Sequence, residues 1–297
     1  MSTTLPPSVE LREVGPRDGL QVEEPKSVEE RMGLVRALAA AGFSAIEVGS
    51  FVSPKAVPAM AQSAEVVQAC KELGGFRVVG VALNGRGATD AVAAGVDEIT
   101  AGVSASEGYS QSNTNMSIEQ ALVHVEKMCE VGRDGGVAVD LMISCAFGSP
   151  YEGEIAPSEV AKVVQLARDA GATTISLADT TGMATPRGIG ELLEEVGTDV
   201  GMHFHETRGT GLANVYASLL GGVTRFDASV GGLGGSPFAK GAAGNVATEG
   251  VVNLLDDLGV DTGVDLVRLL DAATLLHDLV GHDLPSPVFK AGPRIAA

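Results

Sequence analysis

The chain repeats one pattern of hydrophobic and polar positions. A stretch rich in alanine and leucine ends near a glycine, and a short apolar run follows it. The glycines fit the position just past a helix, which favours positive φ, and the apolar runs are typical of parallel strands buried on both faces. Five segments carry the pattern: ALAAAGFSAIEVGSF, AVAAGVDEITAGVS, CEVGRDGGVAVDLMIS, QLARDAGATTISLAD and SLLGGVTRFDASVGG. The glycines expected to end the helices are Gly42, Gly95, Gly136, Gly171 and Gly222.

Three further segments, VELREVG, FRVVGVAL and DVGMHFH, bring the expected strands to eight. Eight strand–helix units in about 230 residues predict an α/β fold, a (β/α)8 TIM barrel. A doubly wound open sheet is the alternative that the alternation alone leaves open. The amphipathic segment 263–281 is expected to form an extra C-terminal helix on the barrel. We therefore expect one domain over residues 1–297, with a core of about 9–260 and a C-terminal helical extension and tail over 261–297.

Composition narrows the possible partners. The chain has 297 residues, is 45% hydrophobic, and carries 38 acidic against 20 basic residues for a net charge of −18. Such a field disfavours nucleic acid and anionic membranes. No apolar run reaches membrane-spanning length, and MSTTLPPSVE lacks the features of a signal peptide. The three cysteines show neither metal nor disulfide spacing, so we expect a cytoplasmic protein with reduced thiols.

Polar residues stand at the carboxyl ends of the expected strands, where the active sites of such barrels lie. They are Arg17 and Asp18 after the first strand, Glu47 in the second, Ser144 at the end of the fifth, Asp179 at the end of the sixth, and His203 and His205 in the seventh. The two histidines are two residues apart, so on a strand they point to the same side. Two imidazoles and a carboxylate at one mouth indicate a divalent-metal site.

Each of these residues also has a purely structural interpretation. Glu47 could pair with a basic residue, an H-x-H pair on a strand often binds nothing, and Asp179 could cap a helix or begin a turn. The coincidence of so many polar residues at the same end of the strands favours the metal site.

A glycine-rich segment, SVGGLGGSPFAKGAAGN, spans residues 229–245. Glycines at this density cost backbone entropy, so the segment needs unusual dihedral angles or a close approach to a ligand. A flexible surface connector is the alternative when the segment is taken alone.

Six motifs occur in order along the chain: EVGPRDGLQ, IEVGSFVSPKAVP, SCAFGSPYEG, SLADTTG, HFHETRGTGLAN and VGGLGGSPFAKGAAGNVATE. Over residues 9–280 the chain resembles the 3-hydroxy-3-methylglutaryl-CoA lyases, which are metal-dependent TIM-barrel lyases related to Claisen-type synthases. The resemblance implies cleavage of that acyl-CoA to acetyl-CoA and acetoacetate, a reaction of leucine catabolism and ketone body formation. It also implies one Mg²⁺ or Mn²⁺ per subunit and a homodimer.

The resemblance also assigns roles to individual residues. The implied metal ligands are Asp18, His203, His205 and Asn245. The implied catalytic residues are Arg17, Glu47, Asp179, His203 and Ser236. The implied substrate-binding residues are Arg17, Gln21, Ser144 and Ser176. In this scheme Arg17 holds the thioester oxygen, Asp179 or His203 is the base, and the glycine-rich segment is a lid over the substrate.

Three positions depart from the family pattern. Ser236 stands where the lid usually has a catalytic cysteine, Gly250 replaces an acidic residue, and HETRG, with Glu206 and Arg208, replaces HDTYG. The first departure matters most, because a hydroxyl loses its proton far less readily than a thiol. It leaves open a lyase for a related 3-hydroxyacyl-CoA, or a non-cleaving relative that binds metal and acyl-CoA. A condensing synthase is a further alternative, but GPRDGLQ and the lid favour the lyases.

Overall fold

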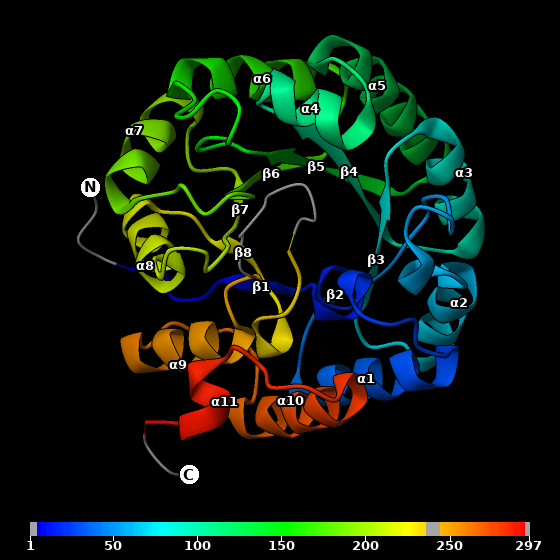
Figure 1. Ribbon diagram of the computed structural model, residues 1–297, viewed down its shortest axis with the longest axis vertical. Coiled ribbons are helices and arrows are strands. Elements are labelled where there is room, and N and C mark those ends of the chain that lie inside the picture. Colours follow the sequence, from blue (N-terminus) through cyan, green and yellow to red (C-terminus); the bar gives the residue numbers. More distant parts are fainter. Residues whose placement is uncertain (1–4, 236–243, 295–297) are drawn as a thin grey trace.

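The computed structural model describes residues 5–235 and 244–294 and has a closed barrel of eight parallel strands at its centre (Figure 1). Neighbours along the chain are neighbours in the barrel, and β1 pairs with β8 to close it. The strands are β1 (Glu10–Glu13), β2 (Ala45–Ser50), β3 (Arg77–Ala82), β4 (Glu98–Ser104), β5 (Ala138–Ser144), β6 (Thr174–Ala178), β7 (Gly201–His203) and β8 (Arg225–Ala228). The predicted (β/α)8 TIM barrel is confirmed, and the closure excludes the open sheet.

Helices surround the barrel, as Figure 1 shows. They are α1 (Val28–Ala41), α2 (Ser63–Leu73), α3 (Gly85–Ala94), α4 (Glu107–Thr114), α5 (Ile118–Gly135), α6 (Pro157–Asp169), α7 (Pro186–Val196), α8 (Gly211–Gly221), α9 (Thr248–Leu258), α10 (Leu266–Val280) and α11 (Pro287–Ala291). The predicted extra helix is α10, which packs beside α1; the Asp265 backbone N–H donates to the carbonyl of Ala41. The single-domain assignment and the boundary near residue 260 stay predictions.

Glycines end the helices where the pattern places them. Gly42, Gly95, Gly136 and Gly222 have φ of 106°, 97°, 68° and 98° and cap α1, α3, α5 and α8. Gly42 is the most constrained, because a Cβ there would lie 2.3 Å from the carbonyl oxygen of Gly263. Gly171 has φ of 93° but follows Ala170, which is the capping residue of α6. Each turn therefore redirects the chain from helix to strand at little steric cost.

The two faces of the barrel strands differ in chemistry. Residues facing the helices, such as Ile46, Ile99 and Leu141, are buried and apolar and form the main core. Alternate residues, such as Thr100 and Asp140, are polar and bond to one another inside the barrel. Within the described ranges, no helix is long and apolar enough to cross a membrane.

Candidate metal and active site

A tight turn after β1 places Arg17 and Asp18 at the mouth of the barrel. The turn is a five-residue helix, Gly15–Gly19, and the carbonyl of Val14 accepts the Asp18 backbone N–H at 2.7 Å. Gly15 is required, because a Cβ there would lie 2.7 Å from a carboxylate oxygen of Glu13. That oxygen accepts the backbone N–H of Gly15 at 2.7 Å and ties the turn to β1.

Three predicted metal ligands converge at this mouth. One ligand atom from each of Asp18, His203 and His205 lies within 4.8 Å of the others, and all three side chains are buried. The Nε2 atoms of the two histidines face each other at 3.3 Å. Two imidazoles and a carboxylate form a mixed nitrogen and oxygen donor set that suits a divalent transition metal. The residues present therefore fit a divalent cation.

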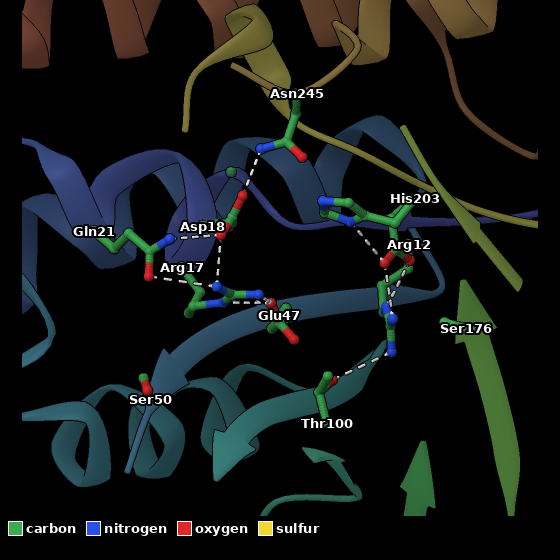
Figure 2. A network of polar contacts seen from close by, with 12 residues as sticks. Arg12, Arg17, Asp18, Gln21, Glu47, Ser50, Thr100, Ser176, His203 and Asn245 are labelled. Carbon is green, nitrogen blue, oxygen red and sulfur yellow. Dashed lines mark hydrogen bonds and ion pairs between the residues drawn. The ribbon is translucent and has the colours of Figure 1, made fainter. Parts of the chain in front are cut away.

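Asn245, the fourth predicted ligand, lies beside the carboxylate of Asp18. Its Nδ2 donates to Asp18 Oδ2 at 2.6 Å and to the carbonyl of Leu233 at 2.9 Å. Its Oδ1 is buried and has no hydrogen-bond partner among the described residues. In Figure 2 this oxygen lies on the side of the amide that faces His203. A buried acceptor without a donor is the state expected of a metal or substrate ligand.

The described ends of the glycine-rich segment reach this centre. A Cβ on Gly234 would lie 2.5 Å from Asn245 Nδ2 and 2.9 Å from Asp18 Oδ2, and one on Gly244 would lie 2.1 Å from the carbonyl oxygen of Gly232. The segment therefore needs glycine because its backbone runs against the candidate ligands. Ser236 lies outside the described residues, so its role and that of the lid stay predictions.

Burial and neighbouring charges set the protonation states of the candidate metal ligands. Burial, and next to it the positive charge of a protonated His203, lower the pKa of His205 to about 4. Burial raises the pKa of Asp18, but the charges of Arg17 and His203 outweigh it and hold that pKa below its usual value. At neutral pH the site thus offers an ionised carboxylate and a neutral His205, the forms that bind metals.

Arg17 is held in place by acidic neighbours (Figure 2). Its Nε donates to Glu47 Oε1 at 2.5 Å, and one terminal nitrogen donates to Asp18 Oδ1 at 2.6 Å. The side-chain Nε2 of Gln21 donates to the same Asp18 oxygen at 2.7 Å. Glu47 therefore does pair with an arginine, and that pair sits at the edge of the candidate metal centre.

Asp179 directly follows β6, and its two carboxylate oxygens have different surroundings. Oδ1 accepts the backbone N–H groups of Met183 and Ala184 at 2.6 and 2.9 Å, while Oδ2 is buried without a hydrogen-bond partner in the described ranges. Burial raises the pKa of this carboxyl group to about 6, against the opposing effect of the two N–H donors. Its backbone N–H donates to the carbonyl of His203 at 2.8 Å. The group is thus both a turn cap and a carboxylate that titrates near neutrality.

A cavity of ≈ 430 Å³ opens at the mouth, and Arg17, Asp18, Gln21, His203 and His205 are among its lining residues. Ser144 also lines it. A second cavity of ≈ 170 Å³ shares Arg17, Tyr109 and Ser144 with the first.

Ser176 lies deeper in the barrel than the other predicted site residues. Its hydroxyl donates to Asp140 Oδ2 at 2.9 Å, and it lines a separate cavity of ≈ 140 Å³ with Arg12 and Asp227. Its predicted contact with substrate stays a prediction.

Two residues beside the site were not predicted from the sequence. Asp227 on β8 bonds to His203, and Arg12 on β1 bonds to Asp227. Each is a charged residue inside an expected strand, which was the available signal.

The fold and site define a TIM-barrel enzyme with a candidate two-histidine, one-carboxylate metal centre at the carboxyl ends of its strands. The HMGL-like family model matches residues 8–276. The chain belongs to the HMGL-like family. The predicted family and the carbon–carbon lyase class are thereby confirmed.

One relative and two solved structures carry related names. A Pseudomonas aeruginosa protein named 3-hydroxy-3-isohexenylglutaryl-CoA/hydroxy-methylglutaryl-CoA lyase is 45% identical, over 97% of this chain and 98% of its own. A crystal structure of the hydroxymethylglutaryl-CoA lyase from Pseudomonas aeruginosa matches with TM-score 0.93 at 44% identity, covering 97% and 98%. An HMG-CoA lyase from Acinetobacter baumannii in complex with coenzyme A and 3-methylmalate matches with TM-score 0.92 at 38% identity, covering 100% and 99%. All three names include hydroxymethylglutaryl-CoA lyase. They do not favour the two alternatives left open by the sequence, a lyase for a related acyl-CoA or a non-cleaving relative.

Proposed function

We propose that the protein cleaves 3-hydroxy-3-methylglutaryl-CoA to acetyl-CoA and acetoacetate, with one Mg²⁺ or Mn²⁺ bound per chain. The observation that carries this proposal is the convergence of Asp18, His203 and His205 beside the Arg17–Glu47 pair, at the mouth of a cavity. The names of the similar proteins support the choice of substrate. The coenzyme A in the Acinetobacter baumannii structure supports an acyl-CoA ligand.

Asp18, His203, His205 and Asn245 would hold the cation. When bound, it would coordinate substrate oxygens and lower the pKa of the tertiary hydroxyl group. The four residues leave coordination positions for substrate, as a Lewis-acid site requires.

Asp179 fits the role of base better than His203 does. His203 has its Nδ1 against Asp227 and its Nε2 turned toward the other ligands, so neither ring nitrogen is free to take a proton. Asp179 has a buried oxygen without a partner among the described residues and a pKa of about 6, which suits a base near neutral pH. In the proposed step the carboxylate takes the hydroxyl proton, and the bond between the second and third carbons breaks. The electron pair of that bond passes to the acetyl-CoA fragment as an enolate, and the third carbon becomes the ketone of acetoacetate.

Arg17 would hold the thioester oxygen on which the enolate charge develops. Its guanidinium group lines both mouth cavities, and Glu47 and Asp18 fix its orientation before substrate arrives. Oriented donors of this kind need no reorganisation during the reaction and are worth far more than in water. Ser236 is proposed to deliver the proton that quenches the enolate, directly or through water. Gln21, Ser144 and Ser176 are proposed to contact the acyl group.

The test is detection of products. Purified protein is incubated with a panel of 3-hydroxyacyl-CoA thioesters and Mg²⁺ or Mn²⁺, and products are identified by mass. The proposal expects acetyl-CoA and acetoacetate in equal amounts from 3-hydroxy-3-methylglutaryl-CoA. Release of neither product with either metal would contradict it. We also propose a cytoplasmic homodimer, which light scattering showing only monomer at micromolar concentration would rule out.

A further inference from the structure

Arg12 is a buried arginine that neither the family motifs nor the proposed reaction uses. It lies on β1 inside the barrel, below the mouth, and is only 5% exposed. All three of its guanidinium nitrogens donate hydrogen bonds. The acceptors are Asp227 Oδ1 and Oδ2 at 2.8 and 2.9 Å, Glu98 Oε1 at 2.9 Å, Asp140 Oδ2 at 3.0 Å and Thr100 Oγ1 at 3.4 Å.

The contact with Asp227 is bidentate, with Nε and one terminal nitrogen each bonded to a different carboxylate oxygen. Two parallel hydrogen bonds fix the plane of the carboxylate as well as its position. Asp227 Oδ2 also lies 3.2 Å from Nδ1 of His203. Arg12 therefore contacts Asp227, and Asp227 in turn contacts His203, a proposed metal ligand.

The consequence is a defined tautomer of His203. An ionised carboxylate can only accept, so the proton of the neutral ring must sit on Nδ1. The lone pair then stays on Nε2, which faces His205 and the rest of the candidate centre. A carboxylate behind a ligating imidazole holds the ring orientation and raises its basicity.

We propose that Arg12 is a positioning residue for the metal centre, which locks the Asp227 carboxylate and through it fixes the tautomer and orientation of His203. The inference rests on the proposed function only in taking His203 as a metal ligand. The competing explanation is that Arg12 merely neutralises buried acids: it also bonds Glu98 and Asp140, and Arg77 shares Glu98 at 3.0 Å.

A matched pair of isosteric variants separates the two explanations. Asp227→Asn and Glu98→Gln each replace a carboxylate that bonds to Arg12, but only Asp227 contacts His203. Arg12→Lys keeps the buried charge and loses the planar fork. Mn²⁺ affinity is measured on the full-length, metal-free proteins by calorimetry, together with thermal unfolding without metal.

Positioning predicts that Asp227→Asn and Arg12→Lys weaken Mn²⁺ binding about 10- to 100-fold, the range seen when partners of metal ligands are removed. Glu98→Gln should change the dissociation constant less than about threefold, even where it lowers the unfolding temperature. Long-range ¹H–¹⁵N spectra of the histidine rings, recorded without metal, should show His203 protonated at Nδ1 in the wild type and in Glu98→Gln. The other two variants should show a mixture of tautomers.

The proposal is overturned if Arg12→Lys and Asp227→Asn keep wild-type Mn²⁺ affinity, or if Glu98→Gln weakens binding as much as they do. A wild type that binds Mn²⁺ with this pattern but cleaves no acyl-CoA would contradict the proposed function alone. A wild type that cleaves the substrate while all variants bind Mn²⁺ equally would contradict only the role of Arg12.

Discussion

The mouth of the barrel and the interior beneath it both contain buried polar side chains, many of them carboxylates. The two regions differ in whether the oxygens of these side chains have partners. In the interior, all six carboxylate oxygens of Glu98, Asp140 and Asp227 have partners. At the mouth, Glu47 Oε2, Asp179 Oδ2 and Asn245 Oδ1 are buried without a hydrogen-bond partner in the part of the chain that the structure describes.

Buried polar atoms are nearly always paired, and leaving one unpaired costs about 1–3 kcal/mol. Three such atoms at the mouth of the barrel therefore indicate a place where a ligand supplies the missing partners. The interior does the opposite: its acids are already paired with arginines and hydroxyl groups and support the groups above them. Whether the polar atoms of a buried cluster all have hydrogen-bond partners therefore distinguishes a binding site from a structural support better than the cluster's composition does.

Variants of two arginines, Arg17 at the mouth and Arg12 in the interior, test this difference most strongly. Arg17→Gln removes the donor proposed for the enolate oxygen, so kcat should fall about 10²- to 10³-fold, the cost of losing one such donor. Mn²⁺ affinity should fall less than kcat, although Arg17 also bonds to the proposed ligand Asp18. Steady-state kinetics and calorimetry on Arg17→Gln and Arg12→Lys provide the comparison. Equal losses of kcat and Mn²⁺ affinity in Arg17→Gln would show that Arg17 acts mainly by positioning the metal ligands.

The Asp179 carboxyl group gives a second prediction, in the pH profile. Its pKa is raised to about 6 by burial, so the ionised base is present above that value and disappears below it. We expect kcat/KM to be level near pH 7 to 8 and to fall about tenfold per pH unit well below 6. Initial rates in buffers of constant ionic strength measure this. A level profile down to pH 5 would remove Asp179 as the base.

The smallest expected effect concerns Ser236. Its hydroxyl is essentially never ionised at neutral pH, whereas a few per cent of a cysteine thiol is. Ser236→Cys should therefore raise turnover of 3-hydroxy-3-methylglutaryl-CoA by about an order of magnitude, measured as acetoacetate release under identical metal. Ser236→Ala is the matched control and should fall below the wild type. Equal rates for all three proteins would mean that another group carries the proton.

Strand periodicity predicted much of the site, because it fixes which face of a strand a residue occupies. His203 and His205 were expected on one side of the seventh strand. β7 ends at His203 and His205 follows it in an isolated bridge to Asn245, yet the ring nitrogens of the two histidines lie 3.3 Å apart. Periodicity does not fix depth along the barrel. Ser176 shares the inward face of β6, yet it lies low enough to bond Asp140.

Other parts of the site depend on contacts between distant segments. Asn245 meets Asp18 across 227 positions of sequence, so no local pattern indicates the pair and only the family resemblance did. Arg12 and Asp227 are 215 positions apart, and neither belongs to a motif that suggests a site. Their pairing follows from closure of β1 on β8, which only the three-dimensional structure supplies.

In the proposed function, cleavage depends on one divalent cation held by Asp18, His203 and His205. The most direct measurement titrates exhaustively chelated enzyme with Mn²⁺ and follows bound ion and acetoacetate release together, with His205→Ala in parallel. We expect activity and occupancy to rise together to one ion per chain in the wild type, and His205→Ala neither to retain the ion nor to cleave the substrate. Full activity in metal-free enzyme, or in His205→Ala after the same chelation, would contradict it.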